Sequence, residues 1–453
     1  MMSKSNNKVK LGHISPHVGG GVGAVLKDFI DLSIFHEVEN HLFCLDKCDT
    51  NFQQLAVSGV KLEALAYQSD PSFLRFLSEC DVILLHYWNH PLLAKFLATV
   101  QIPPCRLLVW CHNSGLQEPH IIPSYLTRMA RKVIFTNHCS INAPNLKSLY
   151  QSEAHKFGTV HSTHSLQYFY EVGRSRIRQD LVTRLLYVGT VSKAKMHADS
   201  ARIFASLSCQ GFSICVVGGP DHLSLQDEVA SLGGQIDAVG WTHSVTNFYR
   251  NADIFVYPLR NDHYGTGEQV LLEAMAAGLP AVAFNNLAEA EIIEQGETGA
   301  LVSSVEEFID SVKTISSDLA HYGKMSAQAV ERVVCEFEAT IMTKKLIDYL
   351  KATLDSEKIR PRLPIDDKSK PVNELEFLAL NSFFDEALAW DVHHNPLEGP
   401  EFILSKIKLS LGNPEMASIW TAKTKSSPFH YLSYFPTSDG LQNLIRMIEA
   451  ECH

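Results

Sequence analysis

Short, almost continuous apolar runs alternate with longer segments of helical periodicity along most of the chain. Apolar runs of this kind are typical of strands buried on both faces, and their alternation with helices indicates parallel sheets covered by helices. In the first part of the sequence the pattern predicts strands at 9–14, 41–45, 81–86, 106–111 and 132–137.

The pattern begins again after residue 182, so the sequence predicts two Rossmann-like halves of the α/β class. In the second half it predicts strands at 184–189, 212–219, 236–241, 252–258 and 281–284, and helices at 199–207, 245–251 and 338–354. We expect a first domain over 1–170 and a second over 171–355. Residues 356–453 are expected to form a linker and a mainly helical extension of unassigned role, with helices around 374–388 and 441–451.

Residues 264–280 form a glycine-rich loop that runs directly into a predicted helix. Such a loop exposes backbone N–H groups, and a helix N-terminus carries a partial positive charge, so the two together suit an anionic ligand. Glu268 is expected in the first helical turn, and Glu273 about one and a half turns later. Gly278 and Pro280 predict the end of the helix. An ordinary buried helix rich in alanine is the alternative interpretation of this spacing.

A second glycine cluster follows the first predicted strand. Residues 19–23 precede an amphipathic helix, and strand, glycine loop and helix together open many nucleotide-binding α/β units. The cluster matches neither Gly-x-Gly-x-x-Gly nor the P-loop pattern, so it identifies no particular nucleotide. A tight turn that needs glycine for its backbone angles is the structural alternative.

Three histidines, His86, His112 and His138, fall at the ends of predicted strands. Ligands of parallel sheets bind beyond the carboxyl ends of the strands, so each of these side chains is a candidate site residue. A lone histidine is more often structural than catalytic. His112 stands out because polar, flexible residues follow it directly.

Composition limits the possible partners. The 453 residues carry a net charge of −11, which disfavours nucleic acid as a partner. A basic segment between residues 121 and 160 allows a peripheral contact with an anionic membrane, although a solvated face is the preferred interpretation. Its cations are Arg128, Arg131, Lys132, Lys147 and Lys156. His393 and His394 lack further ligands at metal-site spacing, so no metal is expected there.

Cysteine usage and apolar runs indicate the compartment. Ten cysteines occur without a Cys-x-x-Cys pair or a disulfide-type spacing, which is typical of reduced thiols. The N-terminus has no signal-type apolar core, and no apolar run is long enough to span a bilayer. We therefore expect a cytoplasmic protein that is at most peripheral at the inner face of the membrane.

Several segments of the second half carry a family resemblance. They are 186–189 with Lys195, 216–220, 239–241 with 252–258, and 265–280 with 291–293 and 296–302. They resemble the retaining glycosyltransferases of the GT-B fold, in the large group typified by sucrose-phosphate synthase and bacterial mannosyltransferases. The segment 265–280 is the most specific of these matches, whereas 20–23 and His112 match the first half of the family more loosely.

The resemblance implies two facing Rossmann-like domains, here with a C-terminal extension, that move a sugar from a nucleoside-diphosphate sugar to an acceptor with retention. The acceptor class stays open among a glycan, a lipid and a small molecule. No cofactor is implied beyond the donor substrate, and no metal is expected, since the chain has no Asp-x-Asp motif. The candidate catalytic residues are His112, Lys195 and Glu268. The candidate donor-binding residues are Gly20, Gly21, Gly23, Thr190, Lys195, Gly240, Arg260, Gly265, Thr266, Gly267 and Glu273.

The resemblance also implies a role for each part of the site. Glu273 would hold the ribose hydroxyls, Lys195 would meet the diphosphate, and His112 would face the donor sugar. The amides of 265–267 would meet phosphate or sugar, and the loop at 20–23 would close over the phosphates. These roles agree with the chemistry, because a cation and preorganised amides stabilise a departing diphosphate and a carboxylate accepts hydrogen bonds from vicinal hydroxyls.

Two positions depart from the family pattern. Gly265 stands where the family usually has a glutamate, eight residues before the second one, and Thr190 stands where it usually has an arginine. We expect Glu268 to compensate for the missing carboxylate, and Arg260 or Lys193 for the missing cation. Two other interpretations remain: a catalytically impaired GT-B protein that binds a sugar nucleotide or a partner, and an enzyme that epimerises or hydrolyses a nucleotide sugar.

Overall fold

The computed structural model describes residues 8–46, 61–64, 71–174, 183–242, 244–261, 263, 265, 267–361, 383, 420 and 426–452. These residues divide into two compact units. The first unit combines the chain up to Ser162 with the part from Met342 onward, and the second spans Thr163–Ile341. This division differs from the expected boundaries at 170 and 355.

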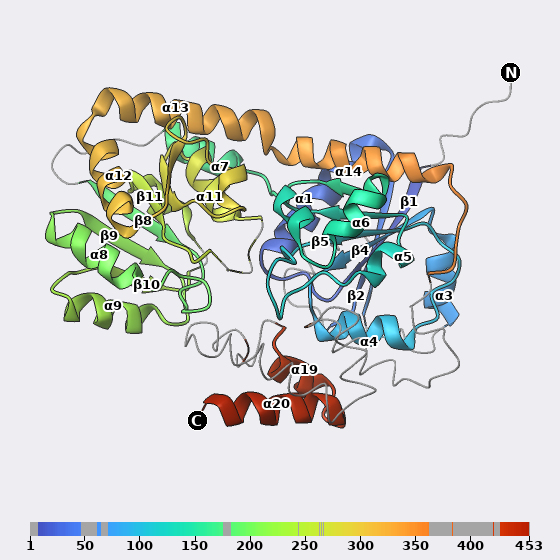
Figure 1. The fold of residues 1–453 in the computed structure, drawn as a ribbon. Helices are drawn as coiled ribbons and strands as arrows, with labels where there is room; N and C mark the ends of the chain where they lie inside the picture. Colours follow the sequence, from blue (N-terminus) through green and yellow to red (C-terminus); the bar gives the residue numbers. More distant parts are fainter. Residues whose placement is uncertain are drawn as a thin grey trace, which may run out of the picture. The chain divides into compact units, whose positions relative to one another are not determined.

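The first unit is built on a parallel sheet whose strand order, within the described residues, is β3-β2-β1-β4-β5-β6-β7 (Figure 1). Its strands are β1 (Val9–Ser15), β2 (Val38–Cys44), β3 (Lys61–Ala64), β4 (Val82–Tyr87), β5 (Leu107–Cys111), β6 (Lys132–Phe135) and β7 (Phe157–Thr159). Its α-helices are α1 (Gly20–Ser33), α3 (Pro71–Glu79), α4 (Pro91–Thr99), α5 (Tyr125–Met129), α6 (Lys147–Ser152), α14 (Ala339–Leu354), α19 (Pro428–Tyr434) and α20 (Asp439–Cys452). All five strands predicted for the first half are present with small shifts at their ends, whereas β3 and β7 lie in segments without a clear strand pattern.

Alternate strand residues face opposite sides of this sheet, as the period of a strand requires. Leu84 faces a core that α1 and α14 complete, whereas its neighbours Ile83 and Leu85 face a core under α3, α4 and α5. Met342 and Leu346 of α14 are buried in the first of these cores. This apolar contact explains why α14 belongs to the first unit although the second unit precedes it in the sequence.

The C-terminal segment contributes to the opposite core of the same unit. Trp420 and Tyr431 are buried there at 1% exposure, and α19 packs against α4. The described part of the extension is therefore a component of the first unit. Helix α20 confirms the helix predicted at 441–451. The helix predicted at 374–388 and the pair His393 and His394 lie outside the described residues.

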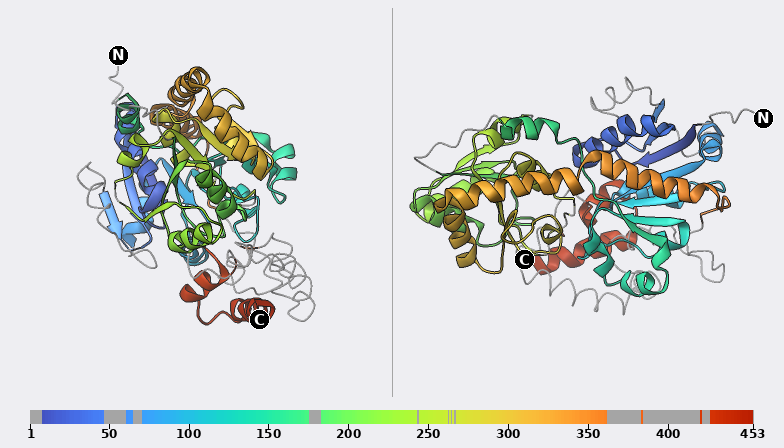
Figure 2. Two further views of the ribbon diagram at one scale, coloured as in Figure 1. Left: turned by 90° about the vertical axis from the view of Figure 1, so that its left-hand side faces the viewer. Right: turned by 90° about the horizontal axis from the view of Figure 1, so that it is seen from above.

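The second unit contains a parallel sheet with the order β10-β9-β8-β11-β12-β13 among the described residues. Its strands are β8 (Arg184–Val188), β9 (Ser213–Val217), β10 (Asp237–Gly240), β11 (Ile254–Tyr257), β12 (Ala281–Phe284) and β13 (Gly299–Val302). Its α-helices are α7 (Gln167–Arg174), α8 (Ser200–Cys209), α9 (His222–Ser231), α10 (Thr246–Arg250), α11 (Gln269–Ala276), α12 (Val305–Ser317) and α13 (Leu319–Glu336). Helices α8 and α9 cover one face of this sheet, and α11 and α13 cover the other (Figures 1 and 2).

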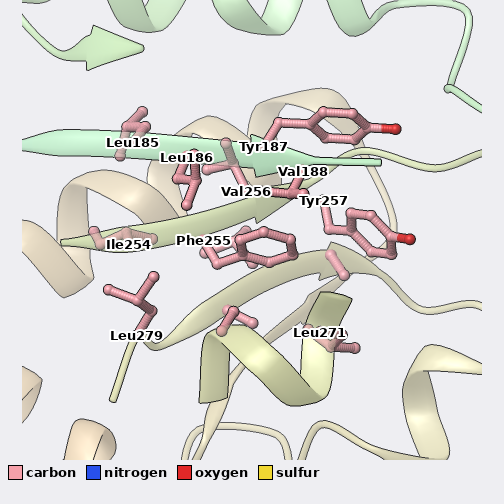
Figure 3. Packing of buried hydrophobic residues seen from close by; sticks show 14 of the residues in the cluster. Leu185, Leu186, Tyr187, Val188, Ile254, Phe255, Val256, Tyr257, Leu271 and Leu279 are labelled. Atoms are coloured by element: carbon pink, nitrogen blue, oxygen red, sulfur yellow. The ribbon is translucent and has the colours of Figure 1, made fainter. Parts of the chain in front are cut away.

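The core of the second unit confirms the prediction of strands buried on both faces. Figure 3 shows side chains of β8 and β11 packed beside Leu271 and Leu279. Leu185, Phe255 and Leu271 are each no more than 1% exposed. Since apolar side chains fill the interiors of these strands, polar side chains of the second unit are found mainly at the strand ends and in the loops. No helix of the described part of the chain is long and apolar enough to cross a membrane.

Candidate functional site

In each sheet the strand order reverses between two neighbouring strands, which are β1 and β4 in the first unit and β8 and β11 in the second. Ligands of open α/β sheets bind beyond the carboxyl ends of the strands at such a switch point. In the second unit, the loops that leave β8 and β11 carry Lys195 and the segment from 258 to 268. The candidate site of this unit lies at these loops.

Main-chain contact shapes this edge of the sheet. Gly189 and Gly218 have φ values of +149° and +132°. A Cβ atom on Gly218 would lie 1.8 Å from the carbonyl oxygen of Gly189, so no larger residue fits there. The loops after β8 and β9 therefore run against each other with no side chain between them.

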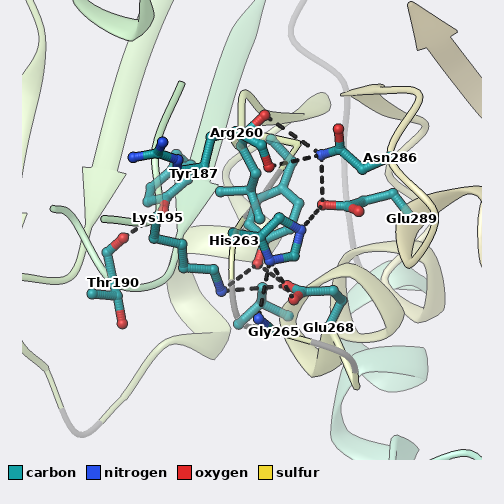
Figure 4. A network of polar contacts seen from close by, with 12 residues as sticks. Tyr187, Thr190, Lys195, Arg260, His263, Gly265, Glu268, Asn286 and Glu289 are labelled. Atoms are coloured by element: carbon teal, nitrogen blue, oxygen red, sulfur yellow. Dashed lines mark hydrogen bonds and ion pairs between the residues drawn. The ribbon is translucent and has the colours of Figure 1, made fainter. Parts of the chain in front are cut away.

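A buried ion pair lies at the switch point of the second unit (Figure 4). The Lys195 ammonium donates to the Tyr257 hydroxyl at 2.9 Å and lies 3.3 Å from Oε2 of Glu268. The Tyr257 hydroxyl in turn donates to the same carboxyl. The Lys195 side chain is 12% exposed and the Glu268 side chain only 2%. A charge removed from water to this extent must keep its partner, because an uncompensated buried charge typically costs about 3–5 kcal/mol.

The sequence predicts Glu268 in the first helical turn. In the structure it lies just before the helix, because α11 begins at Gln269. Glu268 is the N-cap residue and has a left-handed backbone with φ of +30°. A residue with a side chain adopts this conformation only where the surroundings fix it. A Cβ atom on Gly265 would lie 2.0 Å from Oε1 of Glu268. The Glu268 carboxyl thus fills the space that a side chain at position 265 would enter.

A second carboxylate, Glu289, extends the network through His263. Nε2 of His263 lies 3.0 Å from Oε1 of Glu289, and Nδ1 accepts a hydrogen bond from the Gly265 N–H at 3.1 Å. The geometry is that of the neutral ring with its hydrogen on Nε2. Protonation would turn Nδ1 into a donor that faces Oε1 of Glu268 at 3.7 Å and would break the bond from Gly265. The protonation state of His263 is thereby coupled to the glycine loop.

The charges of this network shift its pKa values in opposite directions. Burial by itself lowers the pKa of His263, but the Glu289 carboxylate, its hydrogen bond and the Glu268 carboxylate outweigh burial and raise it above its ordinary value. Burial raises the pKa of Glu268, but Lys195 and His263 outweigh this effect and lower it. Both shifts stabilise the charged form of each group relative to the same side chain in water.

Glu273 lies farther along α11 and has its own two partners. Its Oε2 atom accepts a hydrogen bond from the Tyr249 hydroxyl at 2.8 Å, and its Oε1 atom lies 3.3 Å from Nε2 of His164. The Glu273 side chain is 12% exposed. The carboxylate is therefore oriented by a fixed donor while part of the side chain still reaches the surface.

The remaining candidates of the second unit surround this network. Arg260 is buried, and its guanidinium donates to the Lys193 carbonyl at 3.0 Å. The Thr190 carbonyl accepts from the Tyr187 hydroxyl at 2.7 Å. Gly240 has φ of +75°, where a Cβ atom would lie 2.8 Å from the His222 ring. Gly267 directly precedes Glu268, whereas Thr266 lies outside the described residues.

We expected the glycine cluster of the first unit to form a loop before a helix. The structure shows that the cluster begins the helix itself. Gly20, Gly21 and Gly23 are the first residues of α1, and Gly19 is its N-cap. A Cβ atom on Gly23 would lie 1.9 Å from the Val18 carbonyl oxygen, so glycine is required there by close packing. Gly20 has φ of +65° and no atom within 4 Å of its Cβ position. The cluster is therefore the start of a helix, and close packing against Val18 explains why residue 23 is a glycine.

His112 follows β5, and its backbone N–H donates to the Tyr87 carbonyl at 2.7 Å. Desolvation lowers the pKa of His112 to about 3, so the ring is neutral near pH 7. His86 lies within β4 and is fully buried, and His138 is exposed at the start of a 3₁₀ turn. Of these three histidines, His86 and His112 contact each other, with 3.1 Å between Nδ1 of His86 and Nε2 of His112.

The sequence analysis missed three members of the site of the second unit, namely Tyr257, His263 and Glu289. Tyr257 and His263 have a local signal, because they flank the apolar run and the glycine loop that were singled out. Glu289 has none, because it meets His263 from 26 residues away. In the described part of the chain, no group of three or more His, Cys, Asp or Glu residues could hold a metal ion.

Comparison with known proteins adds family information. Residues 182–318 match the family model of glycosyl transferases group 1. Over 152 residues the chain is 29% identical to the GDP-mannose-dependent α-(1-6)-phosphatidylinositol monomannoside mannosyltransferase of Mycobacterium tuberculosis, a match that covers 31% of this chain and 40% of that protein. The match therefore spans less than half of the relative's length.

Solved structures are similar over a larger part of the chain. A glycosyltransferase from Rickettsia africae has a TM-score of 0.63 at 16% identity and covers 77% of this chain and 100% of its own. Anabaena Alr3699/HepE, solved in complex with UDP, has a TM-score of 0.60 at 16% identity and covers 76% of this chain and 100% of its own. At these identities the likeness concerns the fold.

We predict that Glu289→Gln lowers the pKa of His263, because it removes one of the two carboxylates that raise it. In the unchanged protein, a raised pKa adds stability that is fully present below the unfolded value of about 6.5 and is lost as the pH rises through the folded value. The urea midpoint of unfolding, measured from about pH 5.5 to about pH 9, should therefore fall less with rising pH in the variant. Glu306→Gln, at a glutamate that is 67% exposed, is the control and should behave like the unchanged protein. Equal slopes for all three proteins would contradict the assignment.

Proposed function

We propose a function for a chain that has the GT-B fold and, over residues 182–318, a glycosyl transferases group 1 domain. The protein transfers a sugar from a nucleoside-diphosphate sugar to an acceptor, with retention of the anomeric configuration and without a metal ion. The observation that carries this proposal is the buried set of Lys195, Tyr257 and Glu268 at the switch point of the second unit. It brings a cation and a carboxylate to the place where this fold class binds its ligands.

In this reaction Lys195 stabilises the departing diphosphate. Negative charge grows on the leaving group in the transition state, and a preorganised cation in a site that excludes water lowers the barrier more than it would in bulk water. Lys195 is held by the Tyr257 hydroxyl and is largely excluded from water, as such a role requires. A fixed ammonium supplies the electrostatic effect that a divalent cation provides elsewhere.

Glu273 holds the ribose of the donor. Vicinal hydroxyl groups are donors, and a carboxylate can accept one hydrogen on each oxygen. The Tyr249 hydroxyl fixes the orientation of the Glu273 carboxylate, so little conformational entropy is lost when a ribose binds. The base remains open, since one relative is named for GDP-mannose and one neighbour is in complex with UDP.

Glu268 supplies the carboxylate that position 265 lacks. A Cβ atom on Gly265 would lie 2.0 Å from Oε1 of Glu268, so the two positions share one space. A glutamate at 268 that turns back over a glycine at 265 places a carboxyl in that space from the other direction. The loss of the family glutamate is thereby compensated three residues later.

The experiment that tests this function is a thermal-shift panel of nucleoside diphosphates and their sugars, followed by turnover assays. A ligand that binds only the folded protein raises its stability by mass action, so the panel identifies the base and then the sugar. Turnover of the stabilising donor should persist in the presence of a chelator, and the product should keep the donor's anomeric configuration by NMR. A sugar nucleotide that stabilises the protein but is never consumed would indicate a binding module in place of an enzyme.

We expect Glu273→Ala to weaken donor binding by about ten- to a hundredfold, because hydrogen bonds to a charged acceptor contribute roughly 1.5–3 kcal/mol. Isothermal titration calorimetry with the stabilising nucleoside diphosphate measures this effect. Glu306→Ala, at an exposed glutamate of α12, is the control and should bind as the unchanged protein does. Unchanged affinity of the Glu273 variant would exclude it from the ribose site.

A reciprocal exchange tests the compensation between positions 265 and 268. Glu268→Gln should lower kcat on the order of ten- to a thousandfold, as the loss of one electrostatic group commonly does. Gly265→Glu alone should be destabilised, because its side chain meets the Glu268 carboxyl. The double variant with Gly265→Glu and Glu268→Gly should recover part of the lost activity. A double variant as inactive as Glu268→Gln, although folded, would contradict a shared carboxylate position.

A further inference from the structure

A row of polar residues crosses the interior of the first sheet. Asn40 lies on β2, His13 on β1, His86 on β4 and His112 directly after β5, and these four strands are neighbours in this order. His13 and His86 are 0% exposed and Asn40 is 8% exposed. Each strand residue lies two positions from an apolar residue of the core beside α1, so the row faces that helix. We call these four residues the histidine row.

The members of the histidine row are linked end to end by hydrogen bonds. Oδ1 of Asn40 lies 3.0 Å from Nε2 of His13, and Nδ1 of His13 lies 3.1 Å from Nε2 of His86. Nδ1 of His86 then lies 3.1 Å from Nε2 of His112. Each ring thus uses both nitrogens in the row, except His112, which uses Nε2.

The far end of the row determines the direction of every hydrogen bond in it. The Ser33 hydroxyl donates to the Ile30 carbonyl at 3.0 Å, and a carbonyl can only accept. The Ser33 oxygen therefore accepts from Nδ2 of Asn40 at 2.8 Å, which leaves Oδ1 of Asn40 facing His13. If the Asn40 amide were turned over, its oxygen would face the Ser33 oxygen. The Ser33 hydroxyl already donates its hydrogen to the Ile30 carbonyl, so two acceptors would face each other.

The direction then passes from ring to ring, because a neutral imidazole has one N–H and one bare nitrogen. His13 must donate from Nε2 to Asn40, so its Nδ1 accepts. His86 must donate from Nε2 to His13, so its Nδ1 accepts in turn. His112 must donate from Nε2 to His86, which leaves its hydrogen on Nε2 and a lone pair on Nδ1.

The rings are neutral, as this argument requires. Burial lowers the pKa of His13 to about 4 and that of His112 to about 3, and burial with the two neighbouring histidines lowers the pKa of His86 well below its ordinary value. A protonated ring would also have two N–H groups, so it could not both donate and accept within the row. The row therefore has one consistent set of hydrogen positions near pH 7.

We propose that the histidine row locks His112 in the neutral tautomer with its hydrogen on Nε2, and that Asn40, His13 and His86 are positioning residues for it. The lock itself does not depend on the proposed function. Where the proposed function holds, the lock has one consequence: Nδ1 of His112 carries no hydrogen, so this atom does not donate a proton to the leaving group.

The test is ¹⁵N NMR of the full chain, deuterated and labelled on its histidine rings, without any ligand. We expect His13, His86 and His112 to show one protonated nitrogen each, at Nε2, and to show ¹⁵N–¹⁵N couplings across the hydrogen bonds from His86 to His13 and from His112 to His86. Such couplings do not arise from three rings that merely share a tautomer. Signals are assigned by their loss in single His→Gln variants. A hydrogen on Nδ1 of His112, a charged ring near pH 7, or the absence of the couplings would overturn the proposal.

A remote variant tests what fixes the direction. Ser33→Ala removes the hydroxyl that orients Asn40, so both orientations of the amide become possible and a second set of signals with the hydrogen on Nδ1 should appear for all three rings together. Ser140→Ala, which removes another buried hydroxyl of the first unit, is the matched control and should leave the single set unchanged. A single unchanged set in Ser33→Ala would overturn the role of Ser33 and Asn40. Since no donor or acceptor is added, the result stands apart from the success or failure of the proposed reaction.

Discussion

Both sheets of this protein are buried on both faces, and this constraint governs where polar chemistry can occur. An unpaired polar group in such an interior loses its hydrogen bonds to water, so each buried donor and acceptor needs a partner inside the protein. Polar side chains therefore gather at the strand ends or form connected sets. The ion pair of Lys195 and Glu268 is one such set, and the row from Asn40 to His112 is another.

The two sets satisfy the constraint in opposite ways. The described partners of the histidine row bring no carboxylate into it, so desolvation dominates and the pKa values of its rings fall. His263 is equally buried, but Glu289 and Glu268 lie against it and raise its pKa. Burial thus lowers the pKa of histidine in the first unit, whereas charged neighbours raise it in the second.

The apolar pattern predicted the strands and both Rossmann-like units because burial on two faces is a local property of the sequence. The glycine-rich segment before α11 was found because a glycine loop followed by a helix is also a local pattern of the sequence. What the sequence did not predict depends on contacts between distant residues. His13 and His86 are 73 residues apart, and α14 and Trp420 join the first unit across the whole length of the second. The periodicity of a single segment does not predict contacts between residues so far apart in the sequence.

The helix start at Gly20 shows a different kind of failure. A run of glycines is compatible with a phosphate-binding loop and with a helix that touches another main chain, and local sequence does not separate the two. Gly23 is required by the Val18 carbonyl, a contact known only once the fold places both residues. Glu268 was misplaced by a single residue for a similar reason: it has a left-handed backbone, and its carboxyl contacts Lys195 and Tyr257 from other segments.

The pairing of Lys195 with Glu268 also bears on how the proposed donor would enter. Without a ligand, each charge compensates the other, so neither is left bare in a buried site. A diphosphate carries more negative charge than one carboxylate and would attract the ammonium away from Glu268. Glu268 would then lose its main cation but keep the Tyr257 hydroxyl, and its free oxygen could accept from a sugar hydroxyl. A sugar nucleotide would give Lys195 a diphosphate and Glu268 a sugar hydroxyl at the same time. A nucleoside diphosphate alone would give a new partner to Lys195 and none to Glu268. If the proposed function holds, the buried pair would therefore favour the complete sugar nucleotide over the nucleoside diphosphate.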